Sequence, residues 1–334
     1  MSNDVMVPLS ILELVRVTEL TDARGALNNA RDLAIHAENW GYNRLWVAEH
    51  HNIIGIASAA TSVVLTHIAE GTKKIRVGAG GIMLPNHAPY VIAEQFGTLA
   101  QLFPGRIDLG LGRAPGTDQV TLLALRRNPE AADAFPQDVV ELQAFLAAPA
   151  PNQRIKAVPA AGTEVPLWIL GSSHFGAVLA AELGLPYAFA SHFAPDLLVS
   201  ALKLYRERFE PSRQLDRPYA MVGVNAIAAE SGRDARRLAT TQQMSFTNML
   251  RGIRGLSHPP IDDIETYWSP AEKMRVQQML ARSVVGSPDA IRAGLCELIK
   301  ETAADELIIV SDVFDHSARL RSFELIARTM ISRE

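Results

Sequence analysis

Three ionisable side chains follow an apolar run in the segment WVAEHHN (46–52). Glu49, His50 and His51 could bind a metal, supply a catalytic base, or serve as hydrogen-bonded structural groups. Side chains alternate between the faces of a strand, so His50 and His51 cannot share one metal if the strand continues through them. The chain also has no HExxH or CxxC motif. We therefore predict no metal site, and expect His50 to face the functional end of the fold while His51 packs against a neighbouring element.

A second group of residues is suited to binding an anion. Gly171, Ser172 and Ser173 stand between a strand pattern and a helix pattern, where free N–H groups and two hydroxyls can bind phosphate. The alternative is an ordinary serine N-cap. Arg113 ends the preceding strand pattern, and its planar guanidinium suits a phosphate. We predict a phosphate-bearing ligand here rather than at residues 286–288 (GSP), which are typical of a helix cap followed by proline.

The glycine-rich segment VGAGGIMLP (77–85) is not a dinucleotide-binding motif. Its glycines give GxGG, and no GxGxxG opens a helix after it, so the sequence predicts no Rossmann-type nicotinamide site. Gly80 and Gly81 lack a Cβ, so their backbone could lie flat against a planar ring. A bulge in the strand is the alternative interpretation.

Eight predicted strands, each followed by a helical pattern, must position these residues. The strands are apolar runs at 7–15, 44–51, 75–84, 106–113, 165–173, 187–193, 219–229 and 306–314. Such alternation implies parallel strands, and eight units predict an α/β fold, a closed (β/α)8 TIM barrel of about 250 residues. Barrel enzymes work at the C-terminal ends of their strands. His192, Asn225 and Asp312, which the last three strands carry, therefore join the candidate site.

The remaining residues are expected in insertions at the C-terminal face of the barrel. The candidates are residues 114–135, 150–164 and, the largest, 244–285. The last contains GIRGLSHPPIDD and no strand pattern, and we interpret it as a lid. A solvated helical excursion without function is the alternative. We expect one domain over residues 1–334.

Composition limits the partners. Of 334 residues 48% are hydrophobic and 20% charged, and the net charge is -4, so we expect a soluble globular protein. The absence of a basic block argues against nucleic acid, and no apolar run is long enough for a membrane span. Cys296 is the only cysteine, which favours a reducing cytoplasm. The first ten residues do not form a signal peptide pattern.

Four segments together carry a family resemblance. They are WVAEHHN, VGAGGIMLPNHAPYVIAEQFGTL, PGRIDLGLGRAPGTD and WILGSSHFGAVLAAELGLP. The order of these segments and the intervals between them resemble those of the bacterial-luciferase-like, flavin-dependent monooxygenases. The resemblance extends from about residue 8 to 330, and within the family the chain is most similar to the uncharacterised luciferase-like oxidoreductases of bacteria. The resemblance implies a (β/α)8 barrel, which agrees with the eight predicted units.

The resemblance also implies an FMN site. Arg113 matches the family's phosphate-binding arginine, and Ser172 and Ser173 match its phosphate ligands. The pair Gly80–Gly81 matches a position where the family often has a non-prolyl cis peptide beneath the flavin. His50 matches the histidine near the reactive edge of the flavin, so we predict a catalytic role for it.

Other positions extend or depart from the family pattern. We include Gly171 and His192 among the predicted cofactor-binding residues. His51 and Glu94 match positions at the family's dimer interface, so a homodimer is expected. Light-emitting members have a cysteine where this chain has Gly112, which puts light emission and an aldehyde substrate in doubt.

The family chemistry implies a two-component monooxygenase. Reduced FMN would come from a separate flavin reductase and react with dioxygen to oxidise a small organic substrate, which agrees with the absence of a nicotinamide motif. One alternative is an NAD(P)H-dependent flavin oxidoreductase. The other is a flavin-binding protein without catalysis, although its relatives lack parts of the barrel, whereas this chain has all eight units.

Overall fold

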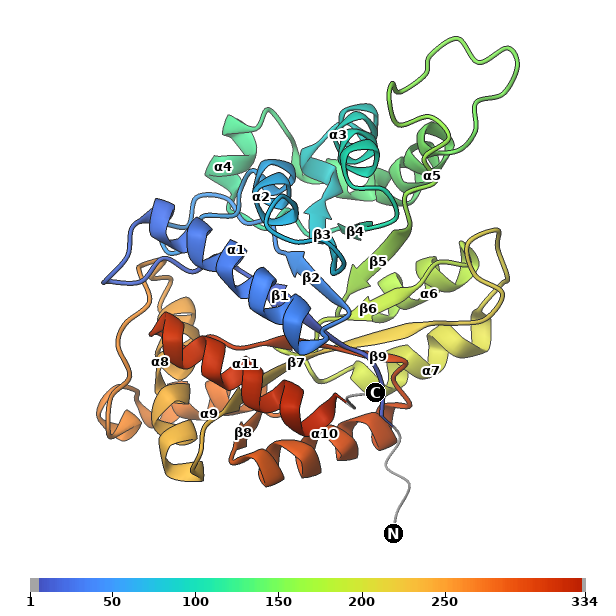
Figure 1. Ribbon diagram of the computed structural model, residues 1–334. Helices are drawn as coiled ribbons and strands as arrows, with labels where there is room; N and C mark the ends of the chain where they lie inside the picture. Colours follow the sequence, from blue (N-terminus) through green and yellow to red (C-terminus); the bar gives the residue numbers. More distant parts are fainter. Residues whose placement is uncertain (1–5, 332–334) are drawn as a thin grey trace.

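The computed structural model describes residues 6–331 and contains a closed barrel of parallel strands surrounded by helices (Figure 1). The barrel strands are β1 Leu9–Glu13, β2 Arg44–Val47, β3 Arg76–Met83, β4 Ile107–Gly112, β5 Leu167–Gly171, β6 Tyr187–Phe189, β7 Ala220–Ala228 and β9 Glu306–Val310. Neighbours pair in the cyclic order β1 to β7 and then β9, which returns to β1. The predicted (β/α)8 barrel is confirmed. Residues 1–5 and 332–334 of the predicted 1–334 domain lie outside the described residues.

Helices cover the outside of the barrel (Figure 1). They are α1 Ala23–Trp40, α2 Thr61–Ala69, α3 Pro89–Leu102, α4 Gln119–Ala124, α5 Phe135–Leu146, α6 His174–Glu182, α7 Leu198–Arg208, α8 Gly232–Leu250, α9 Pro270–Met279, α10 Pro288–Thr302 and α11 His316–Met330. In α1 the Asp22 side chain caps the first turn by accepting from the Gly25 N–H, and Gly41 ends the helix at φ 89°. The buried face consists of Leu33 and four alanines, Ala26, Ala30, Ala34 and Ala37. No helix within residues 6–331 is both long and apolar enough to cross a membrane.

The N-terminal end of the barrel is filled by a paired set of charges. Arg44 opens β2 and donates to Asp108 Oδ2 at 2.7 Å and to Glu306 Oε1 at 2.8 Å. Its guanidinium carbon also lies 4.8 Å from the centre of the Trp168 ring. Buried charges persist when each finds a partner. This end of the barrel is therefore packed core, and the opposite end is left for a ligand.

The predicted insertion 244–285 is more regular than its sequence indicates. Helix α8 runs into it as far as Leu250, and a short 3-10 helix (Ile264–Thr266), α9 and the first residues of β8 (Val284–Gly286) follow. The expectation of no strand here is wrong, because β8 pairs in parallel with β7 outside the barrel. Strand β8 has only three residues, one of them a glycine, and such a short strand has no recognisable hydrophobic pattern in the sequence. The segment is also joined to the end of β1, since Ser257 N–H donates to Val17 O at 3.1 Å.

Candidate active site

A cavity of about 700 Å³ opens at the C-terminal ends of the barrel strands, a volume within the range of ligand pockets. Most predicted site residues line it: His50, Gly80, Arg113, Gly171, Ser172, Ser173 and His192. Gly81 does not line the cavity. Sequence reasoning missed Arg16 and Gln242, which also line it. Parts of α8 and of residues 252–257 form one wall, so the insertion contributes directly to the cavity.

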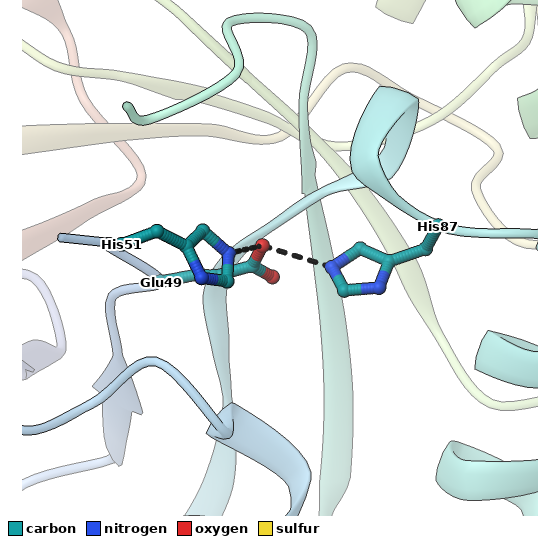
Figure 2. Close-up of side chains that lie close together, drawn as sticks. All are labelled: Glu49, His51 and His87. Carbon is teal, nitrogen blue, oxygen red and sulfur yellow. Dashed lines mark hydrogen bonds and ion pairs between the residues drawn. The ribbon is translucent and has the colours of Figure 1, made fainter. Parts of the chain in front are cut away.

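The two adjacent histidines lie in a loop rather than on a strand. Strand β2 ends at Val47, not at His51 as predicted, so the strand-alternation argument against a shared metal does not apply. The strand ends early because the chain turns away once the apolar residues have filled the core. His50 nevertheless lines the cavity, while His51 turns to Glu49, which His87 contacts from the other side (Figure 2).

His50 is held in one tautomer. Its Nδ1 donates to the Glu49 backbone carbonyl at 2.5 Å, which leaves Nε2 as the acceptor of the neutral ring. Burial lowers the pKa of His50, and the charge of Arg16 lowers it further. A neutral imidazole at the cavity can accept a proton near neutral pH.

Glu49, His51 and His87 form a cluster behind the cavity (Figure 2). Glu49 is fully buried, and its Oε1 accepts from His51 Nε2 at 2.7 Å and from His87 Nε2 at 2.8 Å. Its Oε2 accepts from the Met83 N–H at 3.2 Å. Burial raises the pKa of Glu49, but the two histidine hydrogen bonds outweigh it and hold the pKa below its usual value. Glu49 therefore ties the end of β2 to the segment after β3.

The same three side chains are a donor set that zinc accepts in proteins. Both ring nitrogens, however, lie at hydrogen-bond distance from a single oxygen of Glu49. Each group of the Glu49 cluster is thus already the partner of another. Sequence reasoning did not find His87, which lies 38 positions from Glu49 in the chain.

The predicted anion site is assembled at the start of α6. Ser173 occupies the N-cap position, but its side chain makes no capping hydrogen bond, so the ordinary serine cap is not what is observed. Arg113 lies with its guanidinium carbon 4.1 Å from the centre of the Phe175 ring, and it has no carboxylate partner within residues 6–331. Unused N–H groups, two hydroxyls and a cation therefore meet at one side of the cavity. Ser287, in the alternative segment, does not line it.

The Gly80–Gly81 peptide bond is cis, as expected from the resemblance. The pairing of β3 with β4 shifts between Ala79 and Ile82, so a bulge is present as well. A Cβ on Gly80 would lie 2.8 Å from the Leu12 side chain, and one on Gly81 would lie 2.7 Å from the Gly110 carbonyl oxygen. The backbone contact excludes a side chain at Gly81, whereas at Gly80 a Cβ would displace the Leu12 side chain; Gly80 leaves bare backbone at the cavity.

His192 lies on the cavity wall near His50. Its Nδ1 is buried and has no hydrogen-bond partner in the described part of the chain. Burial, and to a smaller extent His50, lower the pKa of His192 to about 4, so the ring is neutral at pH 7. Gly223 makes room for it, because a Cβ there would lie 2.6 Å from Nδ1. The backbone carbonyl of His192 accepts from Asn225, which in turn accepts from Gln242 at 2.8 Å.

Comparison with known proteins agrees with this geometry. The family model described as luciferase-like monooxygenase matches residues 7–306. A luciferase-like monooxygenase of Escherichia coli (strain K12) is 53% identical over 96% of both chains. An N-acetyl-S-alkylcysteine monooxygenase of Bacillus subtilis (strain 168) is 38% identical over 98% of this chain and 99% of its own.

Solved structures show the same barrel. The crystal structure of apo-MsnO8 superposes with a TM-score of 0.90 at 34% identity and covers 98% of this chain and all of its own. An oxygenating constituent of 3,6-diketocamphane monooxygenase from Pseudomonas putida, in complex with FMN, has a TM-score of 0.70 over 98% of both chains. At 17% identity that likeness shows the fold alone. From the family match and the identity to its relatives, this chain belongs to the luciferase-like monooxygenase family.

Proposed function

We propose that this chain is an FMN-dependent monooxygenase that receives reduced FMN from a separate flavin reductase and oxidises a small organic compound with dioxygen. The observation that carries the proposal is Arg113, which has no acidic partner among residues 6–331 and lies beside the uncapped start of α6. A cation and free N–H groups at one side of a cavity of about 700 Å³ fit a phosphate-bearing cofactor.

The residues present fit FMN in position as well as in charge. Arg113, Ser172 and Ser173 would hold the phosphate, and Gly171 leaves space beside them. The bare backbone of Gly80 would lie against the ring system, with Gly81 shaping the bulge behind it. His192 would contact the cofactor as a neutral ring. Bound FMN supplies the redox and oxygen chemistry.

The residues of the chain would orient the substrate, exclude water from the cavity and transfer protons. His50 presents its Nε2 lone pair to the cavity, so it is suited to accept and return a proton during the reaction. Residues 244–285 act as a lid that excludes water, because their α8 and 252–257 parts form a cavity wall. The lid, the single domain and a homodimer through His51 and Glu94 are parts of this proposal. In the single chain, His51 Nε2 donates to Glu49.

An isotope experiment tests the function. Photoreduced FMN, the protein and ¹⁸O₂ are mixed without any reductase, with N-acetyl-S-benzylcysteine as the probe because a B. subtilis relative acts on N-acetyl-S-alkylcysteine. We expect one ¹⁸O atom in the product, only when protein is present. Steady NADPH oxidation by the protein and FMN alone would support the NAD(P)H-dependent oxidoreductase instead. FMN binding without oxidation of this probe or of cyclic ketones would support the non-catalytic flavin-binding protein.

A further inference from the structure

Arg16 stands on the cavity wall opposite the anion site. It follows β1, and Asp312 follows β9, the neighbouring strand. In the cyclic order of the barrel, the β9–β1 boundary lies directly across from the β4–β5 boundary, which carries Arg113 and Ser172. Both Arg16 and Asp312 line the cavity. Arg16 and Arg113 therefore lie on opposite sides of the cavity.

Most of the hydrogen-bonding capacity of Arg16 is unused. A guanidinium has five N–H donors, yet the one polar contact of Arg16 within residues 6–331 is the ion pair from its Nη2 to Asp312 Oδ2 at 3.1 Å. Its Nε is buried without a partner. Its side chain is 24% exposed, against 4% for Asp312. Arg44, at the other end of the barrel, uses three of its nitrogens on two carboxylates. The free donors of this arginine are therefore available to an acceptor that enters the cavity.

The surroundings indicate what carries that acceptor. Ile56 pairs with Arg16 in an isolated bridge. Further apolar side chains line the same cavity: Leu14, Ile53, Phe246, Met249, Ile253 and Leu256. The charged side chains of the lining are three arginines and one aspartate: Arg16, Arg113, Arg254 and Asp312. Arg254 is exposed and already paired with Asp118 at 2.8 Å. An excess of positive charge with apolar walls favours an anion that has an apolar body.

We propose that Arg16 anchors the carboxylate of an organic acid substrate, whose apolar body lies against the insertion, with Asp312 holding the guanidinium in place. This substrate class rests on the proposed function, since the anion site at Arg113 is reserved there for the cofactor. A guanidinium binds a carboxylate through two parallel hydrogen bonds, which fixes orientation as well as affinity. Arg16 and His50 line the same cavity, so the anchored acid would share that space with the predicted proton acceptor.

A matched pair of probes tests the anchor. Binding of 4-phenylbutyrate and of its neutral amide, 4-phenylbutanamide, is measured by calorimetry on the FMN-loaded protein and on the protein without FMN. We expect the wild type to bind the acid at least about tenfold more tightly than the amide. Arg16→Met, which keeps the apolar stem, should reduce this preference to within about twofold. Arg16→Lys should retain part of it, because the charge stays while the planar fork is lost.

Arg254→Met is the matched control, since it removes another cavity arginine whose ion pair is exposed, and it should keep most of the preference. Equal binding of acid and amide by the wild type would overturn the proposal, as would an unchanged preference in Arg16→Met. A ring carbonyl of FMN is the alternative acceptor for the hydrogen bonds of Arg16. If Arg16→Met weakens FMN binding and spares the acid preference, Arg16 serves the cofactor and the substrate anchor is wrong. Failure of the wild type to bind FMN, with the acid preference intact, would count against the proposed function alone.

Discussion

Two polar groups lie at the same end of the barrel and differ in how completely they are satisfied. In the Glu49 cluster the carboxylate accepts from two histidines and one backbone N–H. On the cavity wall, Arg16 Nε and His192 Nδ1 have no hydrogen-bond partner in the described part of the chain, and Asp312 Oδ2 has only its ion pair with Arg16. A satisfied buried network fixes a local structure, whereas polar groups without protein partners beside a cavity are available to bind what enters it. The difference separates residues that hold the site together from residues that act on what enters it.

The largest expected effect concerns His50, which links the two groups. His50→Gln removes the proton acceptor but keeps a polar side chain of similar length. We expect the rate of substrate oxidation to fall by about 10²–10⁴ with FMN affinity changed by no more than a few-fold. Single-turnover product analysis beside an FMN titration measures both. A destabilised variant that oxidises substrate at the wild-type rate would show that His50 belongs with the Glu49 cluster.

The Glu49 cluster should give the largest loss of stability. Glu49→Leu leaves both His51 Nε2 and His87 Nε2 without their acceptor in partly buried positions, so the free energy of unfolding should fall by about 1–3 kcal/mol for each lost hydrogen bond. Urea unfolding at pH 7.5 measures it. His87→Gln, which can still donate to Glu49, is the control and should cost less. A loss below about 1 kcal/mol in Glu49→Leu would mean that the cluster does not hold the site together.

The anion site should show a loss that is specific to phosphate. Arg113→Ala removes a charge-assisted hydrogen bond worth about 1.5–3 kcal/mol, so the Kd of FMN should rise by about 10- to 150-fold. Riboflavin, which has no phosphate, should bind wild type and variant alike. Fluorescence titration of both flavins checks this. An equal loss for riboflavin would place Arg113 at the ring rather than at the phosphate.

The smallest expected effect is a pH dependence from His192. Its folded-state pKa of about 4 lies below the usual 6.5, so it contributes stability above pH 6.5 that is lost as the pH falls towards 4. Between pH 7.5 and 5 the free energy of unfolding should fall by about 2 kcal/mol, because His192 becomes protonated in the unfolded chain while it stays neutral in the folded chain. His192→Gln should lack this part of the acid sensitivity. The free energies of unfolding of both proteins at the two pH values test it, and parallel losses would contradict the assignment.

The sequence predicted the barrel better than the contacts around its mouth. The strands could be predicted because strands that are buried on both faces appear in the sequence as continuous apolar runs, as in β7 and β9. The predicted strands extend too far at their C-terminal ends, because the residues that follow a strand resemble its continuation. Strand β2, for example, ends at Val47 rather than at residue 51. Arg113 and the serines were found because their local pattern carries the chemistry. His87 and the Arg16–Asp312 pair were not, because such contacts join positions far apart in the chain.

The division of the cavity between strands has a consequence for how the protein can change. Under the proposed function, the groups that would hold the cofactor come from β3 to β5, the start of α6 and the loop after β6, whereas Arg16, Asp312 and much of the apolar wall come from the segments after β1 and β9 and from the insertion. Substitutions at sites that share no partners have nearly additive effects. Exchanging the insertion together with positions 16 and 312 should therefore alter which compounds are accepted while leaving flavin affinity intact. Under the proposed function, the substrate accepted by this chain could thus change without rebuilding the cofactor half of the cavity.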